Sequence, residues 1–156
     1  MTAPATTEIS LTNQRPAIAA LFEARRRIGI RNDELRARSG VAINSAQYWL
    51  AGRSAPTMGN LVAFARALGF EVVLHRECAP ACEMAFNEQS DVMAMLLAER
   101  KRLGMSFLDL EARSGISVNA MFAWRAGASP QLANLVAFAG ALGFEVVLRP
   151  ISEAAP

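Results

Sequence analysis

The chain has 156 residues, of which 53% are hydrophobic and 19% are charged, and its formal net charge at pH 7 is +2. This length and composition predict a globular protein that buries two modest hydrophobic cores. Residues 1–14 hold neither a basic start nor an apolar stretch, and the longest uncharged apolar run, residues 135–144, is too short to cross a bilayer. We therefore expect a cytoplasmic protein without a secretory signal or a membrane partner.

The first predicted helix starts near Asn13 and ends at Gly29, and its apolar residues recur at helical spacing. These apolar residues are Ile18, Leu21, Phe22 and Ile28. A second helix is predicted over residues 32–39, with Leu35 directed inward. It stops at Gly40, because a glycine can adopt the left-handed backbone of a helix terminus. The second and third helices are therefore joined by a tight glycine turn, residues 40–42.

The third predicted helix, residues 43–51, has two unlike sides. The inward side consists of Ala46, Trp49 and Leu50. The outward side consists of Ile43, Asn44, Gln47 and Tyr48. A loop containing Pro56 leads to a fourth helix, residues 60–68, which Gly69 ends. The β-branched run at residues 70–74 then predicts a short strand.

This pattern occurs twice in the chain. Residues 104–148 repeat residues 29–74, with roughly half of the aligned positions identical and one residue missing after Gly127. A unit of this length is typical of a small domain rather than of a solenoid repeat. We therefore predict two paralogous domains, residues 13–76 and 91–150, joined by a linker at residues 77–90.

Two short helices joined by a glycine turn, the second with a polar outer side, are typical of a helix-turn-helix. Residues 29–52 resemble the helix-turn-helix family of phage repressors and Cro, also called the xenobiotic-response-element family, in their glycines, their turn and Trp49. Pro56 and the Ala-Leu-Gly at residues 67–69 continue the resemblance, which covers most of both copies. It implies a mostly α fold with two tandem four-helix helix-turn-helix domains and double-stranded DNA as a partner.

The resemblance also implies roles for single residues. Asn32, at the start of the second helix, would contact phosphate and brace the third helix, while residues 43–45 would read base edges. Asparagine and glutamine can pair with adenine, and Ile43 can contact a thymine methyl group, so we expect a preference that includes A·T pairs. The expected DNA-binding residues are Arg25, Arg26, Arg31, Asn32, Ile43, Asn44, Ser45, Gln47, Tyr48 and Arg53.

The third helix of the second copy, residues 118–125, is less suited to contacting base edges than its counterpart in the first copy. Asn119 is its only uncharged polar side chain, and Phe107 stands where the first copy has Asn32. We expect a helix this apolar to bury Met121 and Phe122 against the first copy or a partner protein. Contact of Phe122 with thymine methyl groups is the alternative. The candidate second-copy DNA contacts are Ser106, Ser117, Asn119, Phe122 and Arg125.

Positive charge is concentrated in the first copy. Residues 1–76 carry ten arginines and five acidic residues, a net +5, whereas residues 77–156 carry six basic and nine acidic residues, a net −3. Only the first copy is therefore typical of a protein that binds a polyanion. The clustered arginines are Arg25, Arg26, Arg27, Arg31, Arg36, Arg38 and Arg53.

The repeated strands suggest how the copies are arranged. A strand as short as residues 70–74 or 144–148 is not stable alone in water, and the two are nearly identical. We expect them to pair as a two-stranded antiparallel ribbon about a pseudo-twofold axis, so that one chain imitates a dimer. Exchange of strands between two chains, giving a homodimer, is the alternative, and we expect some self-association.

Cys78 and Cys82 in the linker, with His75 nearby, could hold a metal or form a disulfide. Zinc normally takes four ligands and the chain has one histidine, so we expect reduced thiols and no cofactor. Neither a phosphate-cradling glycine loop nor a general-acid pair is present, so we do not expect an enzyme.

These observations favour a DNA-binding transcription regulator that represses by occupying a promoter, with the first copy providing most of the base discrimination. The alternative is an adaptor or antiactivator that binds a protein partner through its apolar second copy.

Overall fold

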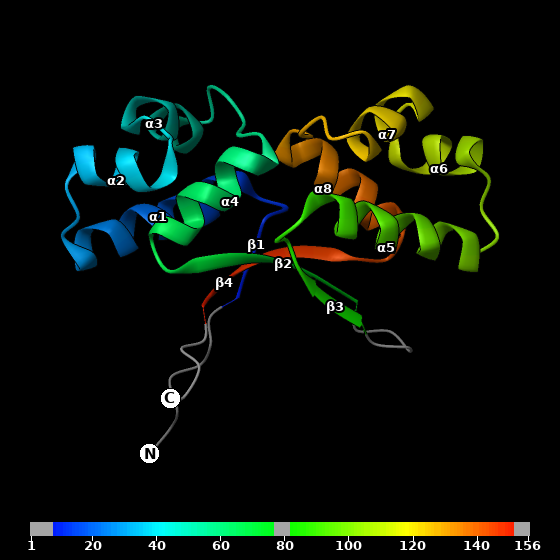
Figure 1. The fold of residues 1–156 in the computed structure, drawn as a ribbon, viewed down its shortest axis with the longest axis horizontal. Coiled ribbons are helices and arrows are strands. Elements are labelled where there is room, and N and C mark those ends of the chain that lie inside the picture. The colour runs from blue at the N-terminus through cyan, green and yellow to red at the C-terminus, as the bar shows by residue number, and fades with distance from the viewer. Residues whose placement is uncertain (1–7, 77–81, 152–156) are drawn as a thin grey trace, which may run out of the picture.

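The computed structural model describes residues 8–76 and 82–151, and this part of the chain is mostly helical with a small antiparallel sheet. The first half contains β1 (Ile9–Ser10), α1 (Gln14–Ile28), α2 (Asn32–Ser39), α3 (Ile43–Ala51), α4 (Met58–Ala67) and β2 (Phe70–Arg76). The second half contains β3 (Cys82–Ala85), α5 (Gln89–Arg102), α6 (Phe107–Ser114), α7 (Val118–Arg125), α8 (Leu132–Ala141) and β4 (Glu145–Pro150). The helices cover one face of the sheet (Figure 1). None of the helices in the described residues is long and apolar enough to span a membrane.

The two repeated strands pair with each other, as the sequence predicts, but they do not form a ribbon of two strands alone. The sheet has the order β1-β4-β2-β3, and all its pairings are antiparallel. The two-stranded ribbon is therefore corrected to a four-stranded sheet. A ribbon of two strands would leave unpaired N–H and C=O groups along both edges, and β1 and β3 pair with those groups. The strand β3 lies within residues 77–90, the segment that we expected to be a linker.

The register between β2 and β4 is centred on a pseudo-twofold axis. Val73 lies opposite Val147, which is its own counterpart in the repeat. On either side of this pair the partners are exchanged, with Val72 opposite Leu148 and Leu74 opposite Val146. Such reciprocal pairing is the pattern found between two identical subunits, here within one chain.

A second reciprocal contact joins the loops before α4 and α8. Thr57 pairs with Gln131 in an isolated bridge, and these two residues are also counterparts. The Met58 N–H donates to the carbonyl of Pro130 at 2.7 Å, and the Leu132 N–H donates to the carbonyl of Pro56 at 2.9 Å. The halves are therefore joined both in the sheet and at the loops before α4 and α8. Of these two contacts, only the pairing in the sheet was predicted from the sequence.

An equivalent pair of aromatic residues holds α3 in the first half and α7 in the second half. Trp49 of α3 packs edge-on against Phe64 of α4, with 5.7 Å between ring centroids, and Trp124 of α7 packs on Phe138 of α8 at 5.5 Å. Both phenylalanines are fully buried. Edge-to-face contacts of this kind favour one orientation of the rings, so α3 and α7 present corresponding sides to solvent.

The elements of the first half follow the sequence predictions closely, with two differences. Ile28, which we expected in the buried stripe of α1, is 55% exposed, because it lies in the last turn beyond the reach of the other helices. The helix α4 begins at Met58 rather than at residue 60, since the Thr57 hydroxyl accepts a hydrogen bond from the Asn60 N–H and Met58 is buried. One hydrophobic cluster extends through both halves, and the division into two domains stays a prediction.

Candidate nucleic-acid interface

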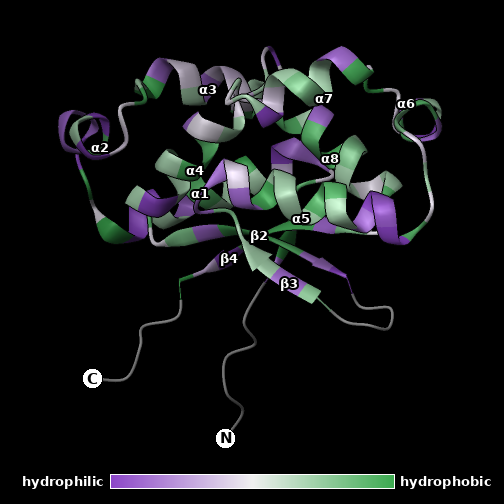
Figure 2. Ribbon diagram, turned by 45° about the vertical axis from the view of Figure 1, so that its right-hand side comes forward, coloured by the Kyte–Doolittle hydropathy of each residue, from purple (hydrophilic) through white to green (hydrophobic). Residues whose placement is uncertain are grey.

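The helices α3 and α7 lie on the side of the molecule that faces away from the sheet (Figure 1). A view turned by 45° shows the same arrangement, with α2 drawn mostly in the colour of hydrophilic residues (Figure 2). The pseudo-twofold axis relates the two helices, because it passes through both contacts between the halves. A single surface therefore presents two helix-turn-helix units.

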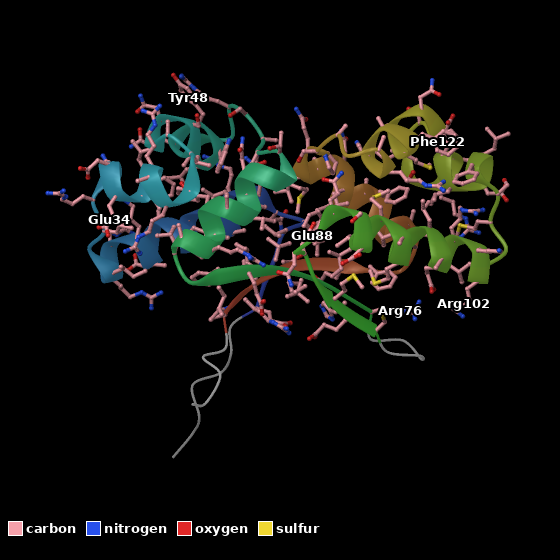
Figure 3. All side chains as sticks on the ribbon, in the orientation of Figure 1. Glu34, Tyr48, Arg76, Glu88, Arg102 and Phe122 are labelled. Atoms are coloured by element: carbon pink, nitrogen blue, oxygen red, sulfur yellow. The ribbon has the colours of Figure 1, made fainter. Side chains whose placement is uncertain are left out.

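The outward side of α3 is open. Asn44, Ser45, Gln47 and Tyr48 are exposed, and Tyr48 retains 51% of its accessible surface (Figure 3). Within residues 8–76 and 82–151, no hydrogen bond or ion pair occupies their side chains. Ile43 is half-buried at the start of the helix. Hydroxyl and amide groups that are exposed and unpaired can exchange water for the edges of bases at low cost.

A glutamine at the start of α1 and another at the start of α5 form hydrogen bonds at the C-terminal ends of α3 and α7. The Gln14 side-chain amide donates to the carbonyls of Trp49 at 2.9 Å and Ser54 at 2.8 Å. Gln89 makes the equivalent bonds to the carbonyls of Trp124 at 2.8 Å and Ala128 at 2.7 Å. The sequence analysis missed both glutamines, although they lie 75 residues apart, the same separation as Gly29 and Gly104.

The N-terminus of α3 is suited to a phosphate group. Its N-cap residue, Ala42, has no side-chain acceptor for the first N–H groups of the helix. A hollow of about 270 Å³ lies in front of it. The hollow is lined by Asn32, Asp33, Arg36, Ala42, Ile43 and Asn44. Free N–H groups and the positive end of the helix dipole attract anions, and the Arg36 guanidinium adds a positive charge. The Asp33 carboxylate on the same lining opposes this attraction, but it is paired with Arg31.

Asn32 is held in a defined orientation by Arg25. The Arg25 Nη2 donates a hydrogen bond to the Asn32 Oδ1. A guanidinium group can only donate, so the Oδ1 is the acceptor and the Asn32 Nδ2 keeps its hydrogens for another partner. A phosphate oxygen is such a partner. Arg25 is half-buried, and its role in this structure is to orient Asn32.

The other arginines predicted to bind DNA differ in whether they form ion pairs within the protein. Arg31 lies 3.2 Å from Asp33 in an exposed ion pair, and Arg26 lies 2.5 Å from Glu23 on the same helix. Exposed ion pairs contribute little free energy, so a phosphate can compete for either arginine. Arg53 follows α3, is exposed and forms no ion pair within the described part of the chain. Arg36 and Arg53 are therefore the arginines that remain available beside α3.

The second half closes the corresponding helix terminus. The Ser117 hydroxyl accepts from the Ala120 N–H at 3.1 Å, and the Glu111 Oε1 accepts from the Val118 N–H at 2.8 Å. Glu111 is the counterpart of Arg36, so the charge at this position is reversed between the halves. The first N–H groups of α7 are satisfied by the chain itself, and a carboxylate lies where a phosphate would otherwise bind.

The helix α6 is also closed at its start. Ser106 and Asp109 form a capping box, in which each side chain accepts a hydrogen bond from the other's backbone N–H. The hydrogen bond from the Ser106 backbone N–H holds the pKa of Asp109 below its usual value. The capping box therefore occupies the Ser106 backbone N–H and one of the two lone pairs of its hydroxyl.

An aromatic column replaces the polar residues of the first half. Phe107 of α6 packs against Phe122 of α7, with 5.3 Å between ring centroids, and the Arg100 guanidinium lies 4.1 Å from the Phe107 ring centroid. The counterparts of these three residues are Arg25, Asn32 and Gln47. Met121 is buried, as expected, but Phe122 is 46% exposed. Phe122 is therefore not buried against the first copy, and the ring that it contacts is Phe107 of its own half. Its burial against a partner protein, the other part of this expectation, stays a prediction. Asn119 and Arg125 are exposed.

The residues considered for a metal or a disulfide are only partly described. Cys78 lies outside the described residues, whereas Cys82 is half-buried with its Sγ 3.9 Å from the Met95 Sδ. His75 lies 3.3 Å from Glu145 on the sheet. No group of three residues that could hold a metal ion occurs within residues 8–76 and 82–151.

No protein-family model, no curated protein and no solved structure matches this chain. The resemblance to phage repressors stays a prediction, and the function has to be argued from the geometry of the interface.

Proposed function

We propose that the protein is a sequence-specific DNA-binding regulator that inserts α3 into the major groove of double-stranded DNA. The observation that supports this most is the exposed and unpaired polar side of α3 next to an open helix N-terminus and Arg36. A groove surface of this kind offers donors and acceptors to base edges and a positive site to the neighbouring phosphate.

The residues divide into two tasks. Asn32, Arg36 and Arg53 would contact phosphates and set the position of the helix, without regard to base sequence. Asn44 and Gln47 would pair with adenine edges, since each carries a donor and an acceptor in one amide plane. Ile43 and Tyr48 flank them and would contact thymine methyl groups. Arg25 acts indirectly, by presenting the amide of Asn32.

Repression in the cytoplasm by promoter occupancy is the regulatory mode that this arrangement supports. A helix seated in the major groove beside a promoter excludes polymerase without chemistry. The rival function is an adaptor or antiactivator that captures a protein. Leu108 on α6, which is 71% exposed, and the exposed Phe122 on the neighbouring α7 favour this rival, because exposed apolar side chains often mark protein-binding surfaces.

Replacing Asn44 and Gln47 together by alanine should relax base preference while leaving general affinity for DNA almost unchanged. Each lost amide removes one base contact, so we expect discrimination against a duplex with substituted A·T pairs to fall about tenfold or more. Duplexes selected from a randomised library, followed by fluorescence polarisation titrations with the preferred and the substituted duplex, measure this ratio.

The matched control is Asn87→Ala, which removes an exposed amide on the loop before α5. It should leave the ratio unchanged. A wild-type chain that binds no duplex at low ionic strength would refute the proposed function.

A further inference from the structure

We propose that one chain occupies a whole operator with two unlike half-sites, and that α7 contacts thymine methyl groups in the second of them. This inference rests on the proposed function, since it requires that α3 binds DNA. It adds what the second half does there, which the exposed polar residues of α3 do not determine.

The arrangement of the halves provides the geometric reason. The pseudo-twofold axis runs through the Val73–Val147 pair of the sheet and the Thr57–Gln131 bridge, so both ends of the contact between the halves obey it. Double-stranded DNA has a twofold axis of its own, and paired helix-turn-helix units meet half-sites about 10 bp apart. With the two axes aligned, a chain whose α3 enters one major groove presents α7 to the same side of the duplex.

The aromatic column determines what α7 can recognise. Gln47, which can pair with an adenine, is replaced by Phe122, and Asn32, which can donate to a phosphate, is replaced by Phe107. Phe122 retains 46% of its accessible surface, and its ring packs on the Phe107 ring. The C5 methyl group of thymine is the apolar group that the major groove presents to such a ring.

The occupied N-terminus of α7 limits the contribution of the second half to the affinity for DNA. Glu111 and Ser117 occupy the N–H groups that would otherwise bind a phosphate, and Glu111 adds negative charge where the first half has Arg36. Contacts of the second half are therefore apolar, modest in affinity and nearly independent of salt. The salt dependence of binding comes from the first half.

The experiment begins with selection of duplexes from a randomised library by the full chain. We expect two unlike motifs about 10 bp apart, one of them containing thymines, and one chain per duplex in sedimentation measurements. Replacing those thymines by deoxyuridine removes only the methyl groups, and should weaken wild-type binding about fivefold. Phe122→Ala should weaken binding by a similar factor and should make the chain indifferent to the deoxyuridine replacement.

Two further variants should each gain a property, so their effects could not be explained by a loss of folding. F107N/F122Q gives the second half the residues of the first, and should shift the selected second motif towards the first. Glu111→Arg should raise affinity and steepen the slope of log affinity against log salt by about 0.9, because it adds one phosphate contact. Thermal melting of each variant checks that the chain is folded.

The outcomes separate the two proposals. Binding to a single motif, with folded Phe122→Ala and deoxyuridine both without effect, would overturn this inference and leave the proposed function standing. Two chains on a symmetric operator would overturn it as well. If Phe122 binds a protein partner instead of DNA, neither Phe122→Ala nor deoxyuridine should change DNA binding. That result would overturn this inference. Failure to bind any duplex would instead refute the proposed function.

Discussion

Reversing the charge of Arg36 and Arg53 to glutamate should lower affinity for every duplex by about a hundredfold or more at low ionic strength. Arg36 lines the hollow at the start of α3, and Arg53 is exposed just beyond its end. Each phosphate contact contributes about 0.9 to the slope of log affinity against log salt, so the double variant should flatten that slope by about 2. Polarisation titrations over a salt series measure both quantities.

The control for this prediction is Arg113→Glu, an exposed arginine of α6 in the second half. It makes the same change in net charge per residue, but the second half is not expected to hold phosphates. Its effect on the slope should be small. Equal losses from Arg113→Glu and from either first-half arginine would show that net charge alone, rather than the site at α3, determines binding.

Replacing Glu99 by glutamine should reduce the free energy of unfolding by about 3 kcal/mol, because a buried ion pair loses one partner. Glu99 is 7% exposed and forms ion pairs with Arg76 at the end of β2 and Arg102 in the last turn of α5. Figure 3 labels these two arginines. The Arg76 guanidinium also lies 5.1 Å from the centre of the Phe144 ring. The bridge thus ties the sheet to the second half, and urea denaturation measures its loss.

The same carboxylate should make stability dependent on pH. Hydrogen bonds from Arg102 and Arg76, with their charges, lower the pKa of Glu99 from the ordinary 4.5 to about 2, against the opposing effect of burial. A carboxyl group whose folded pKa is lowered stabilises the fold above its unfolded pKa. This stabilisation should be complete above about pH 4.5 and should be lost as the pH falls towards 2.

Glu23→Gln is the matched control. Glu23 lies three residues before Arg26, the same spacing as Glu99 and Arg102, but both members of this pair are exposed. The change should leave the free energy of unfolding almost unchanged. If Glu99→Gln were equally mild, or left the stability between pH 4.5 and 2 unchanged, the buried bridge would not be the source of that stabilisation.

Much of the fold could be predicted because local patterns determine it. The bounds of α2 and α3 follow from glycines at 40 and 52, which end each helix in the left-handed region at φ of 74° and 77°. The inward position of Trp49 follows from helical spacing. Ile28 was placed wrongly by the same reasoning, because periodicity gives the side of a helix but does not tell how far along it the neighbouring elements reach.

The candidate site was predictable in its exposed residues and not in its partners. Asn44, Gln47 and Tyr48 could be placed on the outside of α3 from spacing alone. The hydrogen bond from Arg25 to Asn32 joins two helices, and the hydrogen bond from the Val118 N–H to the Glu111 carboxylate closes a helix terminus. Such contacts depend on the angle between elements, which no local pattern contains.

The sequence by itself determined that the chain carries two related helix-turn-helix patterns of unequal charge, since repetition, helix ends and charge are properties of neighbouring residues. Only the tertiary structure decided that the repeated strands pair at Val73 and Val147 within one chain, that β1 and β3 flank them, and that Phe122 stays exposed. The physical reason is that strand register and burial are set by which distant surfaces satisfy one another's hydrogen bonds and exclude water.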